Sequence, residues 1–229
     1  MSLRFVLVYR TGGQYKEWHV RRLMAQLREY CSKRFEIHVI TDDWSFEKPM
    51  TDETIITHYV STNVASWFPG WWLKLLMFHR GVILPGHRYL YFDLDTTIVA
   101  NIDRLVSRVI EADDKFIILE DVYRGHRHYQ SSIMAFSPSP WLNEIYASYV
   151  RNATDTQELF QVGGDQEYIQ YCVALVGKFS DTVYFQDMLP DNVVSYKVHC
   201  PRGRAPAGAS VVIYHGQPKP WDEEGRLYA

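Results

Sequence analysis

Residues 89–97 of the chain read YLYFDLDTT, an unbroken apolar run followed at once by two aspartates. A parallel strand is buried on both faces of its sheet, and an uninterrupted apolar run is typical of such a strand. Ligands of open α/β sheets bind just beyond the carboxyl ends of these strands. The two aspartates, Asp93 and Asp95, therefore lie where a binding or catalytic site is expected.

The segments on either side of this run alternate between strand and helix patterns. The predicted strands cover residues 3–9, 35–41, 54–60, 89–92, 116–119, 132–136, 193–196 and 211–214. The predicted helices cover residues 20–31, 71–80, 140–150 and 165–176. Strands that alternate with helices in units of about 30 residues favour a largely parallel sheet with right-handed crossovers. We therefore expect an α/β fold in a single domain over residues 1–229.

Composition and charge exclude several classes of protein. The 229 residues carry 24 Lys and Arg against 27 Asp and Glu, which argues against a protein that coats nucleic acid by bulk charge. A hydrophobic content of 47% is enough to bury a core, and no apolar run approaches the ~18 residues of a transmembrane helix. The cysteines Cys31, Cys172 and Cys200 are widely spaced without a C-x-x-C pair, so we expect a cytoplasmic protein with reduced thiols.

The aspartate pair could bind a divalent cation. Two carboxylates two positions apart can converge on one ion, and Mg²⁺ and Mn²⁺ prefer such oxygen ligands. His215 directly follows the predicted strand 211–214 and could complete the site, with His199 as a weaker candidate. The competing interpretation is structural, because acidic pairs also cap helices and a single histidine is often a buried packing group.

Three separated segments resemble glycosyltransferase family 8, the family of glycogenin. The first runs from Trp72 and Lys74 through the acidic pair to the N-I-D-x-L sequence at 101–105. The second is the G-G-D-Q sequence at 163–166, and the third is H-G-Q-P-K-P-W at 215–221, similar to the family's closing H-x-x-G-x-x-K-P-W. The motifs keep the family's order and cover residues 70–221, whereas residues 1–70 match only as a strand, a polar turn and a helix.

This resemblance implies a GT-A type, Rossmann-like fold, with a nucleotide-binding half at residues 1–100 and an acceptor and catalytic half at 101–229. It implies transfer of a sugar from a nucleotide-diphosphate donor, with a UDP-sugar expected, to a carbohydrate, lipid-linked or protein acceptor. Retention of the anomeric configuration is implied in the same way. Mn²⁺ or Mg²⁺ would be bound by Asp93, Asp95 and His215.

The chemistry of such a transfer assigns further roles. The leaving diphosphate gains charge as the glycosidic bond breaks, and fixed cations stabilise it. Lys74 and Lys219 are the candidate cations, and Pro218 and Pro220 restrict the turn that carries Lys219.

Other roles rest on the resemblance alone. Asp165 would orient the donor sugar near its anomeric carbon, with Gln166 beside it. Arg10, Thr11 and Tyr15, in the first turn of the chain, are the expected contacts to the base and the ribose.

Two other functions stay open at this point. The D-x-D-x-T sequence at 93–97 also resembles the first motif of haloacid-dehalogenase phosphohydrolases, in which Asp93 would be the nucleophile. That motif normally lies on the first strand of its domain, whereas about 90 residues of α/β pattern precede it here. A non-catalytic nucleotide-sugar-binding module is the third possibility. Trp67, Trp71 and Trp72 are undecided between core packing and sugar stacking.

Overall fold

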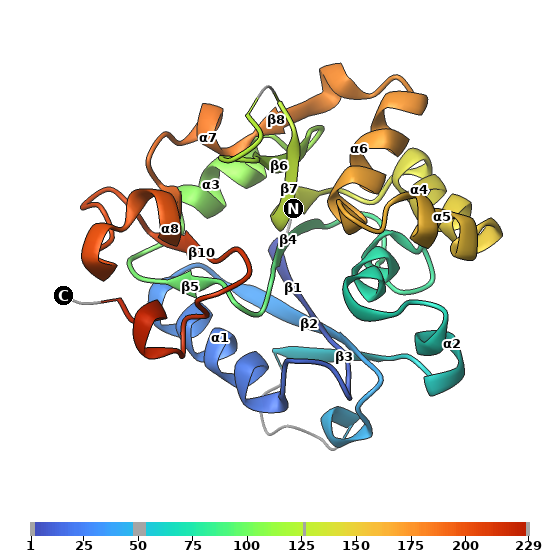
Figure 1. Ribbon diagram of the computed structural model, residues 1–229, viewed down its shortest axis with the longest axis horizontal. Coiled ribbons are helices and arrows are strands. Elements are labelled where there is room, and N and C mark those ends of the chain that lie inside the picture. The colour runs from blue at the N-terminus through green and yellow to red at the C-terminus, as the bar shows by residue number, and fades with distance from the viewer. Residues whose placement is uncertain (1–2, 48–53, 126, 228–229) are drawn as a thin grey trace.

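A central sheet lies between two layers of helices in the computed structural model, which describes residues 3–47, 54–125 and 127–227 (Figure 1). The sheet has the strand order β3-β2-β1-β4-β7-β6-β8. These strands are β1 Leu3–Tyr9, β2 Phe35–Thr41, β3 Ile55–Tyr59, β4 Arg88–Phe92, β6 Phe116–Glu120, β7 Tyr129–Phe136 and β8 Thr182–Tyr184. Neighbouring strands are parallel except that β7 is antiparallel to both β4 and β6. The α/β fold with a mostly parallel sheet is thus confirmed.

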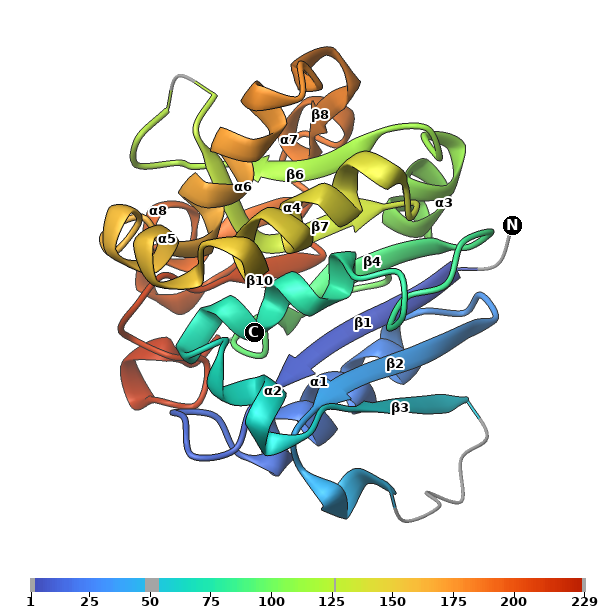
Figure 2. The same cartoon turned by 90° about the vertical axis from the view of Figure 1, so that its right-hand side faces the viewer.

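Helices cover both faces of this sheet. The α-helices are α1 Glu17–Tyr30, α2 Thr62–Ser66, α3 Asp103–Glu111, α4 Pro140–Arg151, α5 Ala153–Leu159, α6 Gly164–Leu175, α7 Phe185–Met188 and α8 Tyr196–His199. The 3-10 helices are η1 Trp44–Glu47, η2 Gly70–Phe78, η3 Phe179–Asp181, η4 Pro201–Gly203 and η5 Glu223–Gly225. Figure 1 shows α1 and α3 on one side of the sheet and α4 and α6 on the other. Figure 2 shows α4 in front of the strands with α1 and α3 behind them.

The apolar runs of β1 and β4 are explained by this sandwich. Side chains alternate between the two faces of a strand. Phe5 and Phe92 pack in the core beneath α1 and α3, whereas Val6 and Tyr91 pack in the core beneath η2, α4 and α6. Because both faces are covered, most positions in these strands have an apolar or aromatic residue; Arg4 and Arg88, near the strand starts, are the exceptions.

A second, small sheet holds the segment from Val193 to Ile213 beside the acidic loop. It comprises β5 Thr97–Ile98, β10 Val211–Ile213 and β9 Val193–Ser195, in the order β5-β10-β9. β10 pairs antiparallel with β5 and parallel with β9. Because β5 begins two residues after Asp95, this pairing brings the segment that follows β10 next to the acidic pair.

The structure differs from the sequence prediction in a few elements. The helix expected over residues 71–80 is the 3-10 helix η2, and its residues 72–78 are all buried rather than forming one apolar stripe. The helices α2, α3, α5, α7 and α8 and the short strands β5 and β8 were not predicted. The other predicted strands and helices are present with ends that shift by a few residues.

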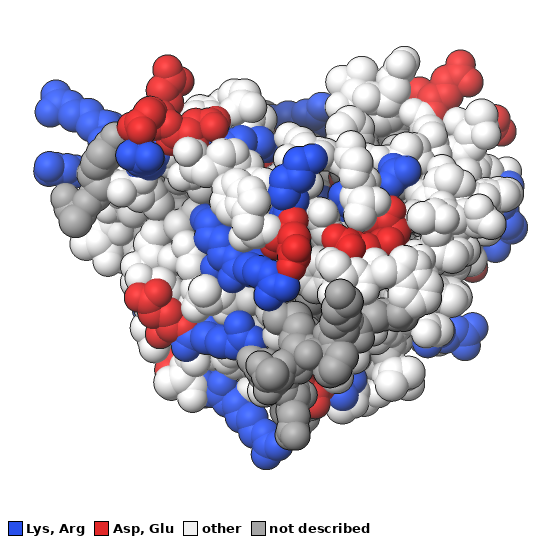
Figure 3. Space-filling view, turned by 90° about the horizontal axis from the view of Figure 1, so that it is seen from below, with Lys and Arg blue, Asp and Glu red and all other residues white. Residues whose placement is uncertain are grey.

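Charged side chains are mixed on the surface seen in Figure 3, where Lys and Arg lie among Asp and Glu rather than in a field of one sign. This agrees with the nearly balanced charge of the sequence. Within the described residues, no helix is both long and apolar enough to cross a bilayer.

A pair of histidines away from the acidic loop, the buried His38 and the half-buried His58, makes folding sensitive to acid. His38 Nδ1 lies 2.7 Å from His58 Nε2, and burial together with His58 lowers the pKa of His38 from 6.5 to about 4. The unfolded chain therefore binds more protons than the folded one below about pH 6.5, and stability is lost as pH falls from there towards 4.

We expect the variant His38→Gln to have a flatter pH dependence of stability. Glutamine can still form hydrogen bonds but does not titrate, so its free energy of unfolding should fall less than that of the wild type between about pH 6.5 and pH 5. Urea denaturation at several pH values measures both curves. Equal slopes for the two proteins would contradict the assignment.

Candidate active site

The acidic loop is fixed at the carboxyl end of β4, in the middle of the sheet. The backbone N–H of Asp93 donates to the carbonyl of Ser132 on β7 at 2.8 Å. A turn follows, in which the N–H of Thr96 donates to the carbonyl of Asp93 at 3.0 Å. The strand pairing and this turn set the directions of the Asp93 and Asp95 carboxylates.

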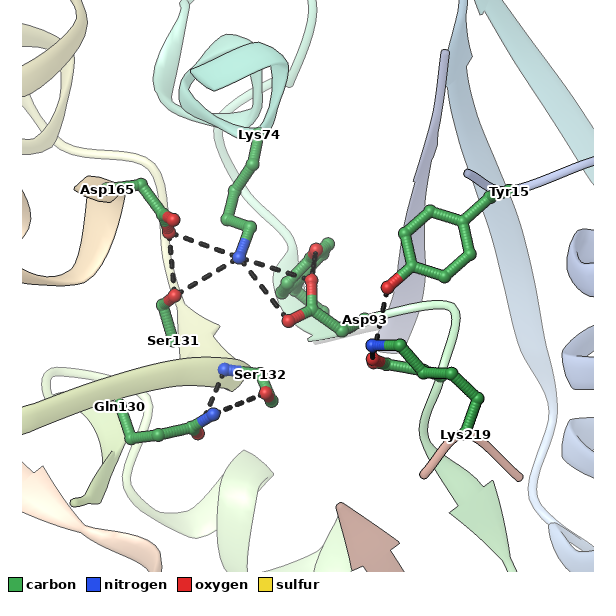
Figure 4. A network of polar contacts seen from close by, with 10 residues as sticks. Tyr15, Lys74, Asp93, Gln130, Ser131, Ser132, Asp165 and Lys219 are labelled. Atoms are coloured by element: carbon green, nitrogen blue, oxygen red, sulfur yellow. Dashed lines mark hydrogen bonds and ion pairs between the residues drawn. The ribbon is translucent and has the colours of Figure 1, made fainter. Parts of the chain in front are cut away.

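Lys74 joins two carboxylates that come from different parts of the chain (Figure 4). Its Nζ lies 3.1 Å from Asp93 Oδ1 and 3.1 Å from Asp165 Oδ2, and it donates to Ser131 Oγ at 3.1 Å. Ser131 Oγ in turn donates to Asp165 Oδ2 at 2.6 Å. The four side chains converge from η2, the end of β4, β7 and the first turn of α6.

Burial and charge act in opposite directions on this cluster. Burial alone would lower the pKa of Lys74, but the carboxylates of Asp165 and Asp93 raise it above its usual value. Burial raises the pKa of Asp165, and Lys74 together with the Ser131 hydrogen bond offsets part of that rise. Lys74 is therefore a permanent, buried cation, because loss of its proton would leave two carboxylates uncompensated.

Asp95 belongs to a second cluster, which it forms with Tyr15 and Lys219. Its Oδ2 accepts from Tyr15 Oη at 3.0 Å and from Lys219 Nζ at 2.5 Å. Burial and the negative charge of Asp93 raise the pKa of Asp95, whereas Lys219 lowers it. The two aspartates are therefore close enough to repel each other, and a lysine partner stabilises each of them.

The candidate metal ligands, Asp93, Asp95 and His215, are of the chemical type that binds divalent cations. Among the residues described, no three or more His, Cys, Asp or Glu side chains already form a metal cluster. However, His215 Nε2 is buried without a hydrogen-bond partner, while the ring of Tyr123 packs edge-on against its imidazole at 5.3 Å. Burial also lowers the pKa of His215, which favours the neutral form that binds metals. Two carboxylates and an unpartnered imidazole suit Mg²⁺ or Mn²⁺.

Arg10, Thr11 and Tyr15, the residues expected to contact the nucleotide, have different hydrogen-bond partners. Tyr15 is part of the Asp95 cluster, as described above. Arg10 Nη1 donates to the carbonyl of Phe68 at 3.2 Å. The N–H and hydroxyl of Thr11 both donate to Asp42, at 2.7 and 2.9 Å. The contacts of Arg10 and Thr11 with a base or ribose therefore stay predictions.

Gln166 and His199 complete the set of candidates. Gln166 is half-buried in the first turn of α6, directly after Asp165, and its amide has no hydrogen-bond partner in the described part of the chain. His199 Nδ1 accepts a hydrogen bond from the N–H of Ser195 at 3.0 Å, a local contact at the end of α8. Gln166 thus adjoins the Lys74 cluster, whereas His199 has a structural partner.

Arg22 is a residue of the site that the sequence did not indicate. From α1 its guanidinium donates to the carbonyls of Leu94 and Thr96, at 3.1 and 2.7 Å, and to Thr97 Oγ1 at 3.2 Å. It also lies 5.7 Å from the ring centroid of Trp221. Arg22 therefore fixes both the acidic loop and the segment that carries Lys219. Its neighbour Arg21 is exposed and pairs with Glu17. Because the two arginines are adjacent in the sequence, only the structure shows that Arg22 contacts the acidic loop and Arg21 does not.

The two neighbouring arginines provide a matched test. Arg22→Gln should lower the free energy of unfolding by about 1–3 kcal/mol, because buried carbonyls of the acidic loop lose their donors. Arg21→Gln removes an exposed i,i+4 pair and a contact with the ring of Phe46, and should change stability by about 1 kcal/mol or less. Urea denaturation measures both variants. Equal losses would show that Arg22 does not hold the loop.

Comparison with known proteins identifies solved structures of the same architecture. A search found no matching protein-family model and no matching relative among curated proteins. The galactosyltransferase LgtC, in complex with donor and acceptor sugar analogues, aligns with a TM-score of 0.63 and 11% identity over 96% of this chain and 90% of that chain. An active-site mutant of LgtC gives a TM-score of 0.66 and 11% identity over 98% and 91%.

A third solved structure is the glycosyltransferase GlyE of Streptococcus pneumoniae TIGR4. It aligns with a TM-score of 0.63 and 10% identity over 97% of this chain and 56% of that chain. At sequence identities of 10–11%, this similarity shows a shared fold and no more. The chain therefore has the GT-A type glycosyltransferase fold that the sequence resemblance predicted.

Proposed function

We propose that the protein is a metal-dependent glycosyltransferase that moves a sugar from a nucleotide-diphosphate donor, a UDP-sugar, to a separate acceptor. One observation carries this proposal: Lys74 bridges Asp93 and Asp165 at the carboxyl edge of the central sheet. A binding site at this edge is the rule for open α/β sheets. The fold shared with LgtC and GlyE supports the same conclusion.

The charge balance of the site supports a bound cation. Two lysines, Lys74 and Lys219, face three carboxylates, those of Asp93, Asp95 and Asp165, which leaves a net charge of -1 when all are ionised. A diphosphate would add further negative charge. Mn²⁺ or Mg²⁺, held by Asp93, Asp95 and His215, would offset it and stabilise the charge that develops on the leaving diphosphate.

The two lysines have a role of their own in this proposal. Both are nearly fully buried, and each is already held by carboxylates before a donor binds. A positioned cation in a site of low dielectric stabilises developing charge without reorganisation. Lys74 and Lys219 are therefore suited to bind the diphosphate oxygens and to stabilise them as the glycosidic bond breaks.

Asp165 is proposed to orient the donor sugar. It is buried at the first turn of α6, and Ser131 and Lys74 restrict its carboxylate. A group held in this way can contact the sugar hydroxyls or the anomeric centre with little loss of entropy. Gln166 would contribute the neighbouring amide. Retention of the anomeric configuration rests on the family resemblance.

The remaining assignments follow from the same scheme. Arg10, Thr11 and Tyr15 are proposed to contact the base and ribose, which places the nucleotide on the half formed by residues 1–100. Residues 101–229 would contribute the acceptor side. The acceptor would be a carbohydrate, free or attached to a lipid or protein. The cytoplasmic location stays a prediction from the sequence.

Nucleotide release from a panel of nucleotide-sugars, with and without Mn²⁺, tests the function. The wild type should release UDP from at least one UDP-sugar, and release should require the metal. Asp165→Asn should slow release by at least about 100-fold while UDP still binds, since it removes a positioned charge. Asp114→Asn, a change at a largely exposed residue, is the matched control and should have wild-type activity.

The other possibilities give different results in the same experiments. A folded, metal-loaded protein that binds no nucleotide-sugar would refute the proposal. Donor binding without release, unchanged in Asp165→Asn, would indicate a binding module. Trapping of a beryllofluoride adduct on Asp93 would indicate a phosphohydrolase; the position of Asp93 after the fourth strand of the chain, not the first, disfavours that activity.

A further inference from the structure

The three neighbouring tryptophans have three different environments. Trp72 belongs to the core, where only 4% of it is exposed and its ring stacks on Tyr149 at 5.0 Å. Trp67 is 60% exposed and lines a surface cavity of about 270 Å³ with residues of α4 such as Tyr146 and Val150. Trp71 is 53% exposed although it lies only three residues before Lys74.

Trp71 lies on the same side of η2 as Lys74. In a 3-10 helix, side chains at positions i and i+3 are eclipsed, so residues 71 and 74 share one face. Lys74 uses that face to reach Asp93 and Asp165. The indole of Trp71 therefore lies one turn before Lys74, on the face of η2 that carries Lys74.

Trp71 also packs against Gly164, the residue that directly precedes Asp165. A Cβ atom built on Gly164 would lie 2.7 Å from Trp71 Nε1, so the indole packs against the backbone of the residue that precedes Asp165. Gly164 also has a φ of +63°, which disfavours any other residue. The glycine thus permits both the start of α6 and the close approach of the ring.

The part of this ring that does not pack against Gly164 is open, because 53% of Trp71 is exposed. Among the described residues, no aromatic ring stacks on Trp71, and no group accepts a hydrogen bond from its indole N–H. By contrast, Trp18 and Trp221, in the aromatic group next to Lys219, contact each other. An indole that is half-exposed and lies beside buried, charged groups has the features of a ligand contact.

We propose that Trp71 is the stacking platform for a pyranose ring bound next to Asp165. This inference rests on the proposed function and deepens it. A pyranose has an apolar C–H face that can cover the indole, while its hydroxyl groups reach the polar atoms of the Lys74 cluster. The nucleotide base is expected at the opposite end of the site, near Tyr15, so the ring that Trp71 binds belongs to the donor sugar or to the acceptor.

Variants of Trp71 distinguish these two sources. The affinities of UDP and of the active UDP-sugar are measured with Mn²⁺ for the wild type, Trp71→Phe and Trp71→Ala, with Trp67→Ala as the matched control. If the platform binds the donor sugar, Trp71→Ala should weaken the UDP-sugar about three- to tenfold and leave UDP unchanged. Trp71→Phe, which keeps an aromatic face, should retain most of the affinity.

The second arm uses methyl glycosides of glucose and galactose as acceptor probes. Each glycoside is titrated into ¹⁵N-labelled protein, alone and with UDP and Mn²⁺, and the indole N–H signal of Trp71 is followed by NMR. This signal is identified by its loss in Trp71→Phe. If the platform binds the acceptor, the glycosides should shift it, and the UDP-sugar affinity of Trp71→Ala should equal that of the wild type.

Two results would overturn the inference. One is an unchanged UDP-sugar affinity in Trp71→Ala together with an unshifted Trp71 signal in every glycoside titration. The other is an equal loss of affinity for UDP and for the UDP-sugar, which would mean that Trp71 binds the nucleotide or only supports the fold. Failure of the proposed function is separate, because it would show as wild-type protein that binds neither UDP nor a UDP-sugar.

Discussion

The arrangement of the site depends on one buried cation, the ammonium group of Lys74 between Asp93 and Asp165. A buried ion pair adds little net stability, because desolvation offsets most of the Coulombic attraction. However, the loss of one partner would leave an uncompensated charge, so alternative placements of the three side chains are strongly disfavoured. The pair therefore fixes η2, the end of β4 and the start of α6 relative to one another. It specifies geometry more than it stabilises the fold.

Much of the fold could be predicted from the sequence because the central strands are buried on both sides. β1 and β2 match their predicted bounds, because β1 is mostly apolar and Asp42 and Asp43 mark the end of β2. The two-residue strand β5 has no such signature, and its pairing with β10 follows from tertiary contacts. Likewise the motifs indicated Lys74 and Asp165 separately, but 90 residues lie between them, and only the packing of α6 against η2 and β7 shows that they meet.

The high aromatic content has two structural uses in addition to core packing. Tyrosine hydroxyl groups donate to the acidic pair: Tyr91 to Asp93 and Tyr15 to Asp95. These donors stabilise carboxylates without adding charge. Rings of Trp18, His19 and Trp221 pack together and hold the turn that carries Lys219 against α1. Periodicity in the sequence could not reveal either role, because each depends on contacts between segments that are far apart.

The second cluster joins Tyr15, Asp95 and Lys219, and the last two are separated by 124 residues. During synthesis the first strands and the acidic loop leave the ribosome long before the segment that contributes Lys219. Until that segment arrives, Asp95 lacks the partner that offsets its burial, and β5 lacks its neighbour β10. Closure of such a long loop is entropically unfavourable and comes late in folding. A nascent chain that still lacks residues 211–219 therefore has most of its central sheet but an incomplete second cluster, so this part of the candidate site forms only after those residues have been added.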